Sequence, residues 1–145
     1  MDEQQLTRDL IDRLFDLHDQ VQVALKTLLR ELRLTEPQAT ALWRLGSDDS
    51  VTASGLAERL GCDASTITAM IDRLEEQGLA RRSQSPVDRR VKLIRLTERG
   101  REKRDRIVRY ATEHSPFTRL NSHEQLQLHS LLNDAAGPRS VQTNI

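Results

Sequence analysis

Hydroxyl-bearing and cationic side chains gather in two short stretches of the sequence, with one acid among them. They are Ser65, Thr66, Thr68 and Arg73 in the first stretch, and Asp88, Arg89, Arg90 and Lys92 in the second. Such side chains donate hydrogen bonds to phosphate oxygens and to base edges, so both stretches are candidates for contact with a nucleic acid. Asp88 is unfavourable next to phosphates, and its physical use there is to hold an arginine in one rotamer.

The charge distribution favours a polyanionic partner although the net charge is zero. The 145 residues include 22 basic and 22 acidic side chains. From Arg59 to Arg109 there are 14 basic and 8 acidic residues, a net charge of +6, and the rest of the chain carries −6. This separation predicts one face presented to a polyanion. Aromatic residues make up only 3%, which disfavours a single-strand binder that stacks bases on aromatic rings.

The segment from Ala53 to Gly78 has the pattern of two short helices joined by a tight turn. Gly61 stands where a helix end needs left-handed backbone, and Asp63 is placed to cap a second helix that runs to Gln77. The pattern requires a small residue and several apolar residues between the helices, and the chain supplies Leu56, Ala57, Leu60, Cys62, Ile67 and Met70. The sequence therefore predicts a helix-turn-helix, with the hydroxyls of the first stretch on its outward face.

A β-hairpin is predicted directly after this helix pair. Its strands cover 79–84 and 91–96, and residues 85–90 form the connection. A hairpin with a basic tip at this place is a wing, and Arg89 or Arg90 is placed to enter a minor groove, whose negative potential attracts guanidinium groups. Two plainer alternatives stay open: the hydroxyls merely complete a helix cap, and the charged turn is merely solvated.

Long helices are predicted on both sides of the central segment. Apolar residues recur at steps of three and four from Leu6 to Leu32, and neither Gly nor Pro occurs before Pro37. The stripe resembles a coiled-coil seam, which favours packing against a partner chain over a role as a lone core helix.

Capping signals predict where the other helices begin. Thr35 with Gln38 forms one capping box, and Ser122 with Gln125 forms a second. Another helix begins at Thr97. The last helix carries an apolar set consisting of Leu126, Leu128, Leu131, Leu132 and Ala135.

The sequence offers no assembled site for catalysis, metal or cofactor. It has no glycine-rich phosphate loop and no nucleophile elbow, and its four histidines do not pair at ligand spacing, so we expect no enzyme, no metal and no cofactor. The single cysteine, Cys62, excludes an internal disulfide and suits a small apolar filler better than a redox sensor. No apolar run is long enough for a membrane span, and the polar N-terminus is unlike a secretory leader, so we expect a cytoplasmic protein.

The order of these motifs resembles the MarR family. The matching stretches are Leu34-Thr35-Glu36-Pro37-Gln38, Leu56-Ala57-Glu58-Arg59-Leu60-Gly61, Asp72-Arg73-Leu74-Glu75-Glu76-Gln77-Gly78-Leu79, Asp88-Arg89-Arg90 and Leu96-Thr97-Glu98-Arg99-Gly100. The resemblance implies a mainly α fold with a small β-wing, in which a winged helix-turn-helix is flanked by long dimerisation helices. It also implies a homodimer that binds pseudo-palindromic double-stranded DNA operators, usually as a repressor.

The resemblance also implies individual roles. The helix from Ala64 to Gln77 is expected to enter the major groove, Asp88 to fix the wing arginine, and Arg90 to reach the minor groove. Many members have arginine where this chain has Ala69. Peroxide-sensing members carry their cysteine in the first helix, where this chain has none, which argues against a thiol switch.

The expected organisation has four parts. They are an N-terminal dimerisation helix at 1–33, a winged helix-turn-helix domain at 34–100, C-terminal dimerisation helices at 101–137 and a flexible tail at 138–145.

A small-molecule effector is expected where the dimerisation helices meet the winged domain, because a ligand at that joint can change the spacing of the two half-sites. The candidate residues are His18, Trp43 and Arg44. Trp43 would form an aromatic wall, and Arg44 or His18 would meet an anionic group, so we expect a small aromatic acid rather than peroxide. Two other functions stay open, a winged-helix protein-interaction module without operator binding and a thiol-based redox-sensing regulator.

Overall fold

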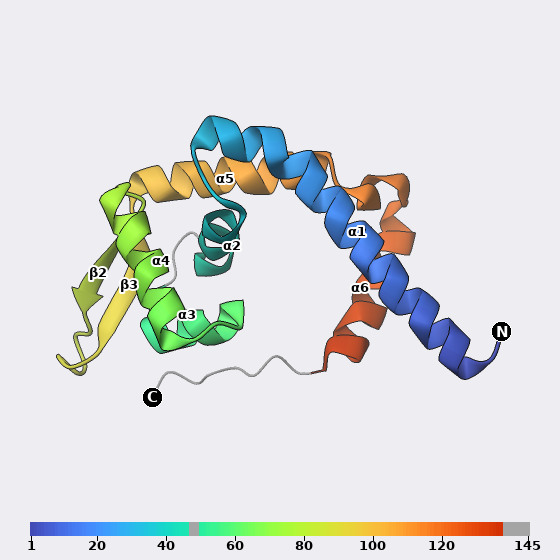
Figure 1. Ribbon diagram of the computed structural model, residues 1–145, viewed down its shortest axis with the longest axis horizontal. Helices are drawn as coiled ribbons and strands as arrows, with labels where there is room; N and C mark the ends of the chain where they lie inside the picture. The colour runs from blue at the N-terminus through green and yellow to red at the C-terminus, as the bar shows by residue number, and fades with distance from the viewer. Residues whose placement is uncertain (47–49, 138–145) are drawn as a thin grey trace. The chain divides into compact units, whose positions relative to one another are not determined.

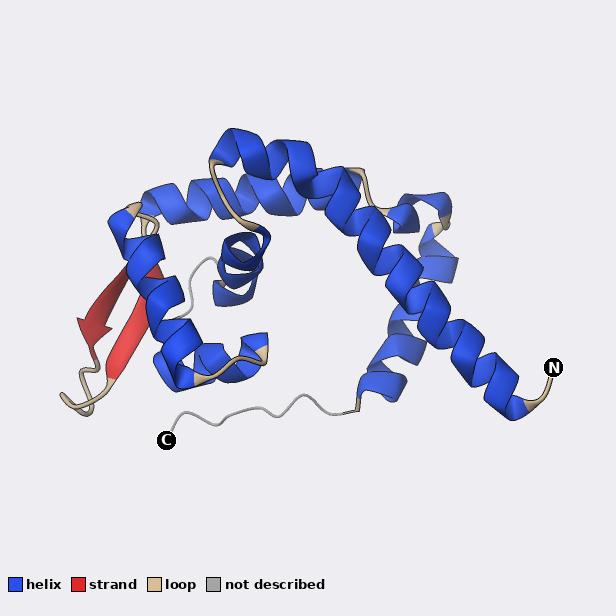
Figure 2. Ribbon diagram, viewed as in Figure 1, coloured by secondary structure: helices blue, strands red, loops and turns tan. Residues whose placement is uncertain are grey.

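The computed structural model describes residues 1–46 and 50–137, and the predicted tail at 138–145 lies outside these ranges. The elements in chain order are α1 (Glu3–Leu32), α2 (Glu36–Leu45), β1 (Val51–Thr52), α3 (Ala53–Leu60), α4 (Ala64–Glu76), β2 (Ala80–Gln84), β3 (Lys92–Leu96), α5 (Glu98–Glu113), the 3-10 helix η1 (Pro116–Arg119) and α6 (Ser122–Ala136) (Figure 1). Helices dominate the described chain and the strands form one small sheet (Figure 2), which confirms the predicted fold class.

The chain divides into two compact units. The terminal unit consists of Met1–Ala24 and the residues from Thr112 onward, with most of α1, η1 and α6. The winged unit consists of Leu25–Ala111, with the end of α1, the helices α2 to α4, the sheet and nearly all of α5.

The core of the winged unit is built by the inward faces of its helices and sheet. The sheet is antiparallel in the order β1-β3-β2, with Val51 opposite Ile94 and Ala80 opposite Leu96. The largest fully buried side chains are Leu42, Leu45, Leu56, Ile67, Ile71, Leu74, Leu79, Ile94 and Ile107. All buried residues of the described ranges belong to this unit. The unit therefore has its own hydrophobic core, on which the candidate contact residues are mounted.

Local capping determines where the helices of the winged unit begin and end. The Thr35 hydroxyl accepts from the Gln38 N–H and the Gln38 amide accepts from the Thr35 N–H, which confirms the predicted box. Gly61 adopts φ 64°, the left-handed conformation predicted for the turn between α3 and α4. The sharp turn follows because a residue without Cβ adopts this conformation freely.

The start of α5 packs directly on the segment that joins α4 to β2. The Thr97 hydroxyl donates to the Gly78 carbonyl over 2.6 Å and accepts from the Gly100 N–H over 3.1 Å. A Cβ on Gly100 would lie 1.9 Å from the Leu79 carbonyl oxygen. Glycine is required here by this close approach of two backbone segments, since a carbonyl cannot rotate away as a side chain does.

The terminal unit presents its apolar side chains to solvent. The most exposed large apolar residues here are Met1, Leu6, Leu10, Ile11, Leu14, Phe15, Val23, Phe117, Leu126, Leu131 and Leu132. Long as they are, none of the helices in the described ranges is apolar enough to cross a membrane.

The predicted cap of the last helix is wrong by one residue. Asn121, not Ser122, is the N-cap of α6, and it forms a capping box with Glu124. The Gln125 amide instead donates to the carbonyls of Phe117 and Leu120, over 2.9 and 3.1 Å. Gln125 is therefore used to fasten η1 to α6, which leaves Glu124 as the reciprocal cap.

Candidate nucleic-acid interface

The hydroxyl-bearing stretch forms the first turns of α4, on the solvent side. The Asp63 carboxylate accepts from the Thr66 N–H over 2.7 Å and from the Ser65 hydroxyl over 2.9 Å. The Thr66 hydrogen bonds, and after them that of Ser65, lower the pKa of Asp63. Ser65 therefore takes part in the helix cap, as the plainer alternative states. Ser65, Thr66, Thr68 and Arg73 nevertheless remain exposed to solvent.

The inner face of α4 anchors the helix on the core. Ile67, Ile71 and Leu74 are buried there. The predicted filling of the wedge between α3 and α4 is only partly correct, because Leu60, Cys62 and Met70 are half-buried. The wedge is closed mainly by Leu56, Ala57 and Ile67. The turn between the helices lies at the surface, so the residues nearest to it keep some solvent contact.

The wing tip is a turn held by its own hydrogen bonds. The Ser85 hydroxyl accepts from the backbone N–H groups of Val87 and Asp88, over 3.2 and 3.4 Å. The Ser85 N–H donates to Val91, and the Val91 N–H donates to Asp88. These hydrogen bonds hold the backbone of the turn in one arrangement, which lowers the backbone entropy lost on binding.

Asp88 contacts Arg90, the wing arginine that it is expected to fix. The Arg90 N–H donates to Asp88 Oδ1 over 3.0 Å, and Arg90 Nε lies 3.7 Å from the same oxygen. The Arg90 side chain is 94% exposed, so this ion pair alone adds little stability. Arg89 and Lys92 are exposed as well. The geometry orients a cation toward solvent rather than burying it.

Arg82, which the sequence reasoning missed, ties the wing to α4. From β2 its guanidinium contacts Asp72 over 2.6 Å and also pairs with Glu75, both on α4. Partial burial lowers the pKa of Arg82, but the bonds to the two carboxylates outweigh it and leave the pKa raised. The pairing spans strand and helix, so only the spacing of acids at 72 and 75 before a basic strand could have signalled it.

Two further arginines of the wing were also missed. Arg81 of β2 stands directly opposite Arg95 of β3, and both are exposed. Like charges in direct cross-strand register are unfavourable unless an anion lies against them. The outer face of the sheet therefore extends the basic surface of the wing tip.

The candidate effector residues fall in both units. Trp43, the single indole, is 39% exposed on α2, and the Arg44 carbonyl accepts from the Arg59 guanidinium over 3.0 Å. His18 lies on the part of α1 that belongs to the terminal unit, 3.5 Å from the Gln22 amide. A common pocket of these residues stays a prediction.

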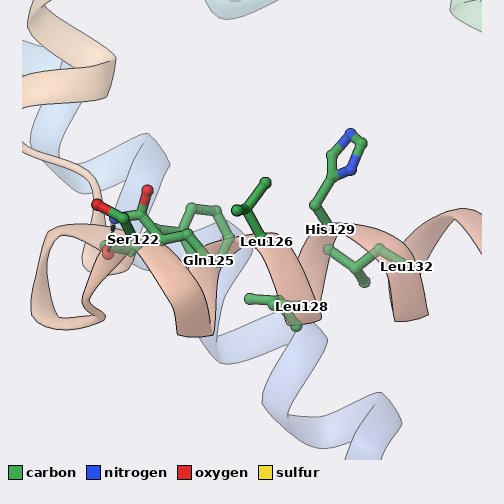
Figure 3. A pocket seen from close by; sticks show the side chains of 7 residues that line it. Ser122, Gln125, Leu126, Leu128, His129 and Leu132 are labelled. Atoms are coloured by element: carbon green, nitrogen blue, oxygen red, sulfur yellow. Dashed lines mark hydrogen bonds between the residues drawn. The ribbon is translucent and has the colours of Figure 1, made fainter.

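A groove of about 570 Å³ runs along α6 in the terminal unit. Figure 3 shows Leu126, Leu128, His129 and Leu132 along one helix, beside Ser122 and Gln125 at its start. The apolar set on the last helix was recognised in the sequence, but the groove that it lines was not predicted. Across the described ranges, no three His, Cys, Asp or Glu side chains gather so as to hold a metal ion.

Comparison with known proteins places this geometry among transcriptional regulators. The model of the MarR family matches residues 34–92. The organic hydroperoxide resistance transcriptional regulator of Bacillus subtilis (strain 168) is 40% identical over 83 residues, 57% of this chain and 56% of that protein. The HTH-type transcriptional repressor MdtR of the same strain is 31% identical over 104 residues, 72% of this chain and 67% of MdtR.

The structural likeness extends further along the chain than the sequence likeness. The crystal structure of CouR from Rhodococcus jostii RHA1 bound to p-coumaroyl-CoA has a TM-score of 0.77 and 29% identity, and it covers 94% of this chain and 98% of CouR. By sequence, the chain spans about half the length of the first curated relatives it matches. The family match lies wholly within the winged unit.

Proposed function

The chain belongs to the MarR family, and from that premise we propose that it is a sequence-specific, double-stranded-DNA-binding transcriptional repressor. It acts as a homodimer in the cytoplasm and catalyses no reaction. Its winged helix-turn-helix domain is the segment at 34–100, and the helices at 1–33 and 101–137 dimerise. A small aromatic anion releases it from the operator.

One observation carries this proposal: α4 and the wing hairpin present hydroxyl and cationic side chains to solvent while an ion pair links the two elements. Asp63 holds the first turn of α4, Asp88 holds Arg90, and Arg82 links the wing to α4. We infer that Ser65, Thr66 and Thr68 approach base edges in the major groove. Arg73, Arg89 and Lys92 contact phosphates, and Arg90 enters the minor groove.

The homodimer is supported by the exposed apolar surface of the terminal unit. Leu10 and Leu14 are 61% and 58% exposed on α1, and Leu126 is 69% exposed on α6. A patch of this kind marks an interface in a protein that would otherwise aggregate. A two-fold axis then sets two half-sites about one helical turn, roughly 10 base pairs, apart.

The effector class is supported by the chemistry at α2. Trp43 offers a partly exposed aromatic face, and Arg44 beside it offers a cation. CouR, which resembles this chain over nearly its whole length, is bound to p-coumaroyl-CoA, a thioester with an aromatic group. A coupling of roughly 1–3 kcal/mol between effector and operator suffices for release.

The proposal is tested by selecting bound duplexes from a random pool and by measuring affinity for the selected operator against salt. We expect a steep loss of affinity with salt, because several cations displace counterions. Arg90→Ala should weaken binding by roughly 1–3 kcal/mol, whereas the matched control Arg8→Ala on the terminal unit should not. Equal binding by wild type and Arg90→Ala contradicts the wing assignment, and a pool that retains no duplex indicates a protein-interaction module.

A second candidate for control is thiol oxidation. It is favoured by the 40% identity to a regulator of organic hydroperoxide resistance and by the half-buried Cys62 in the turn of the helix-turn-helix. Operator release by phenolic acids and by peroxide, measured on wild type and on Cys62→Ser, separates the two. Release by peroxide that disappears in Cys62→Ser assigns the switch to the thiol and contradicts the aromatic-anion effector.

A further inference from the structure

Four cations gather where the end of α1 meets α5, and the proposed function uses none of them. This α1–α5 cation cluster consists of Arg33, Arg99, Lys103 and Arg106. The three residues of α5 follow at steps of four and three, so they share one face of the helix. The Lys103 ammonium donates to the Leu32 carbonyl over 2.8 Å, which brings α5 next to the end of α1 and Arg33.

Little negative charge offsets the cluster. Glu31, 3.4 Å from Arg106, is the one carboxylate within ion-pair distance of these cations among the described residues. Partial burial, and after it the charges of Arg99, Arg33 and Arg106, lower the pKa of Lys103. The charged form of Lys103 is therefore less stable than that of a free lysine, and an anion at the cluster would stabilise it.

The cluster lies away from the surface assigned to DNA. Within the winged unit, the turn between α3 and α4 and the tip of the β2–β3 hairpin point to one end (Figure 1). The end of α1 and α5 lie at the other end of the same unit. A duplex seated on the wing tip and the first turns of α4 does not account for this charge.

We propose that the α1–α5 cation cluster binds a small, multiply charged anion, and that phosphate groups are its chemical class. Guanidinium groups present pairs of N–H donors that match phosphate oxygens, and the ammonium of Lys103 adds a compact charge. Bound there, the anion joins the end of α1 to α5. This site is separate from operator recognition and adds a second ligand to the protein.

Inorganic triphosphate is the probe. It is titrated into the full-length protein by calorimetry at constant ionic strength, with sodium chloride of the same ionic strength as the blank. We expect saturable binding of one triphosphate per chain. Arg99→Gln and Arg106→Gln should each weaken it by about tenfold or more, as the loss of a charge-assisted contact predicts. Arg8→Gln, an exposed arginine of the terminal unit, is the matched control and should bind as wild type does.

Thermal unfolding separates binding from a structural role of these arginines. Without anion, Arg99→Gln removes a like charge near Lys103, so its midpoint should equal or exceed that of wild type. With triphosphate, wild type should gain stability and the variant should gain little. Triphosphate should also raise the pKa of Lys103, followed by NMR of its side chain.

Three outcomes overturn the proposal. The first is the absence of saturable triphosphate binding, and the second is equal binding by wild type and the Arg99→Gln/Arg106→Gln double variant. The third is weaker operator binding by these variants while triphosphate binds no better than chloride, which assigns the cluster to the DNA backbone. Operator binding by Arg90→Ala tests the proposed function separately, so its failure is distinguishable from failure of the anion site.

Discussion

Most leucine and isoleucine side chains are buried in the winged unit, whereas those described in the terminal unit are exposed or half-buried. Leu42 and Ile71 have no exposed surface, whereas Leu10 and Leu126 are 61% and 69% exposed. Both units are helical and both have apolar residues at helical spacing. The difference shows that an amphipathic stripe predicts a buried face without telling whether the chain itself or a partner covers it.

The energetics of the two units differ accordingly. Burial of a leucine side chain is worth roughly 1.5–3 kcal/mol, and the winged unit gains this within its own fold. In the proposed homodimer the terminal unit gains it on association, so its stability should depend on protein concentration. We therefore expect the terminal unit to be destabilised by charges placed on its apolar surface. The winged unit should instead be destabilised by changes in the volume of its core.

The largest effect is expected from charges placed on the apolar stripe of α1. Leu10→Glu combined with Leu14→Glu should weaken the homodimer by at least about 100-fold, close to 2.8 kcal/mol, because carboxylates would be desolvated in the interface. Sedimentation equilibrium measures the dissociation constant. Gln4→Glu, which adds a single negative charge to an exposed position of the same helix, is the control. A wild-type protein that stays monomeric at high concentration would show that no second copy of the chain covers the apolar stripe of α1.

The second effect concerns the joint at the start of α5 in the winged unit. Gly100→Ala places a methyl group against the Leu79 carbonyl, so the backbone must shift and the free energy of unfolding should fall by about 2 kcal/mol. Urea unfolding followed by circular dichroism checks this.

Glu102→Ala, exposed on the same helix, is the control for Gly100→Ala and should change the unfolding free energy by about 0.5 kcal/mol or less. A Gly100→Ala protein as stable as this control would show that the backbone at the start of α5 can move away from Leu79 at little energetic cost. The contrast with the terminal unit would then rest on side-chain burial alone.

Local signals in the sequence were sufficient for most of the winged unit. Thr35, Gly61 and Asp63 act within four residues of their partners, so each cap follows from the immediate sequence. The cap of α6 was ambiguous because Asn121 with Glu124 and Ser122 with Gln125 satisfy the same rule. Only the contacts of Gln125 with η1 decide between them.

Contacts between distant elements were beyond the sequence reasoning. The pairing of Arg82 with Asp72 and Glu75 requires the distance between β2 and α4, and the opposition of Arg81 and Arg95 requires the strand register. The shared effector pocket is a prediction of the same kind, since its residues come from both units.

A smaller effect is expected from the bridge between wing and α4. Arg82→Met keeps an unbranched apolar stem but leaves Asp72 and Glu75 without their cation, which should cost about 1 kcal/mol of stability for a partly exposed group. Operator affinity should also fall, because the wing loses its fixed position relative to α4. Arg82→Lys should restore part of both, and an Arg82→Met protein with unchanged operator affinity would limit the bridge to a structural role.

The smallest effect should have the opposite sign, and it concerns the residue that ends α1. Arg33 has φ 56°, the one positive φ outside glycine in the described ranges, and the Leu34 N–H donates to the Leu29 carbonyl behind it. A Cβ is strained in this conformation, whereas glycine adopts it freely. Arg33→Gly should therefore raise the unfolding free energy by about 0.5 kcal/mol, after the entropy that glycine gains in the unfolded chain is subtracted.

Two further variants separate this strain from charge. Arg33→Ala keeps the Cβ and removes the cation, so it should gain less than Arg33→Gly if strain dominates. Arg30→Gly, inside the last turn of α1, should lose stability because glycine is unfavourable within a helix. Equal gains for Arg33→Ala and Arg33→Gly would instead assign the effect to relief of the repulsion around Lys103. The end of α1 would then be limited by the same charge that we propose an anion neutralises.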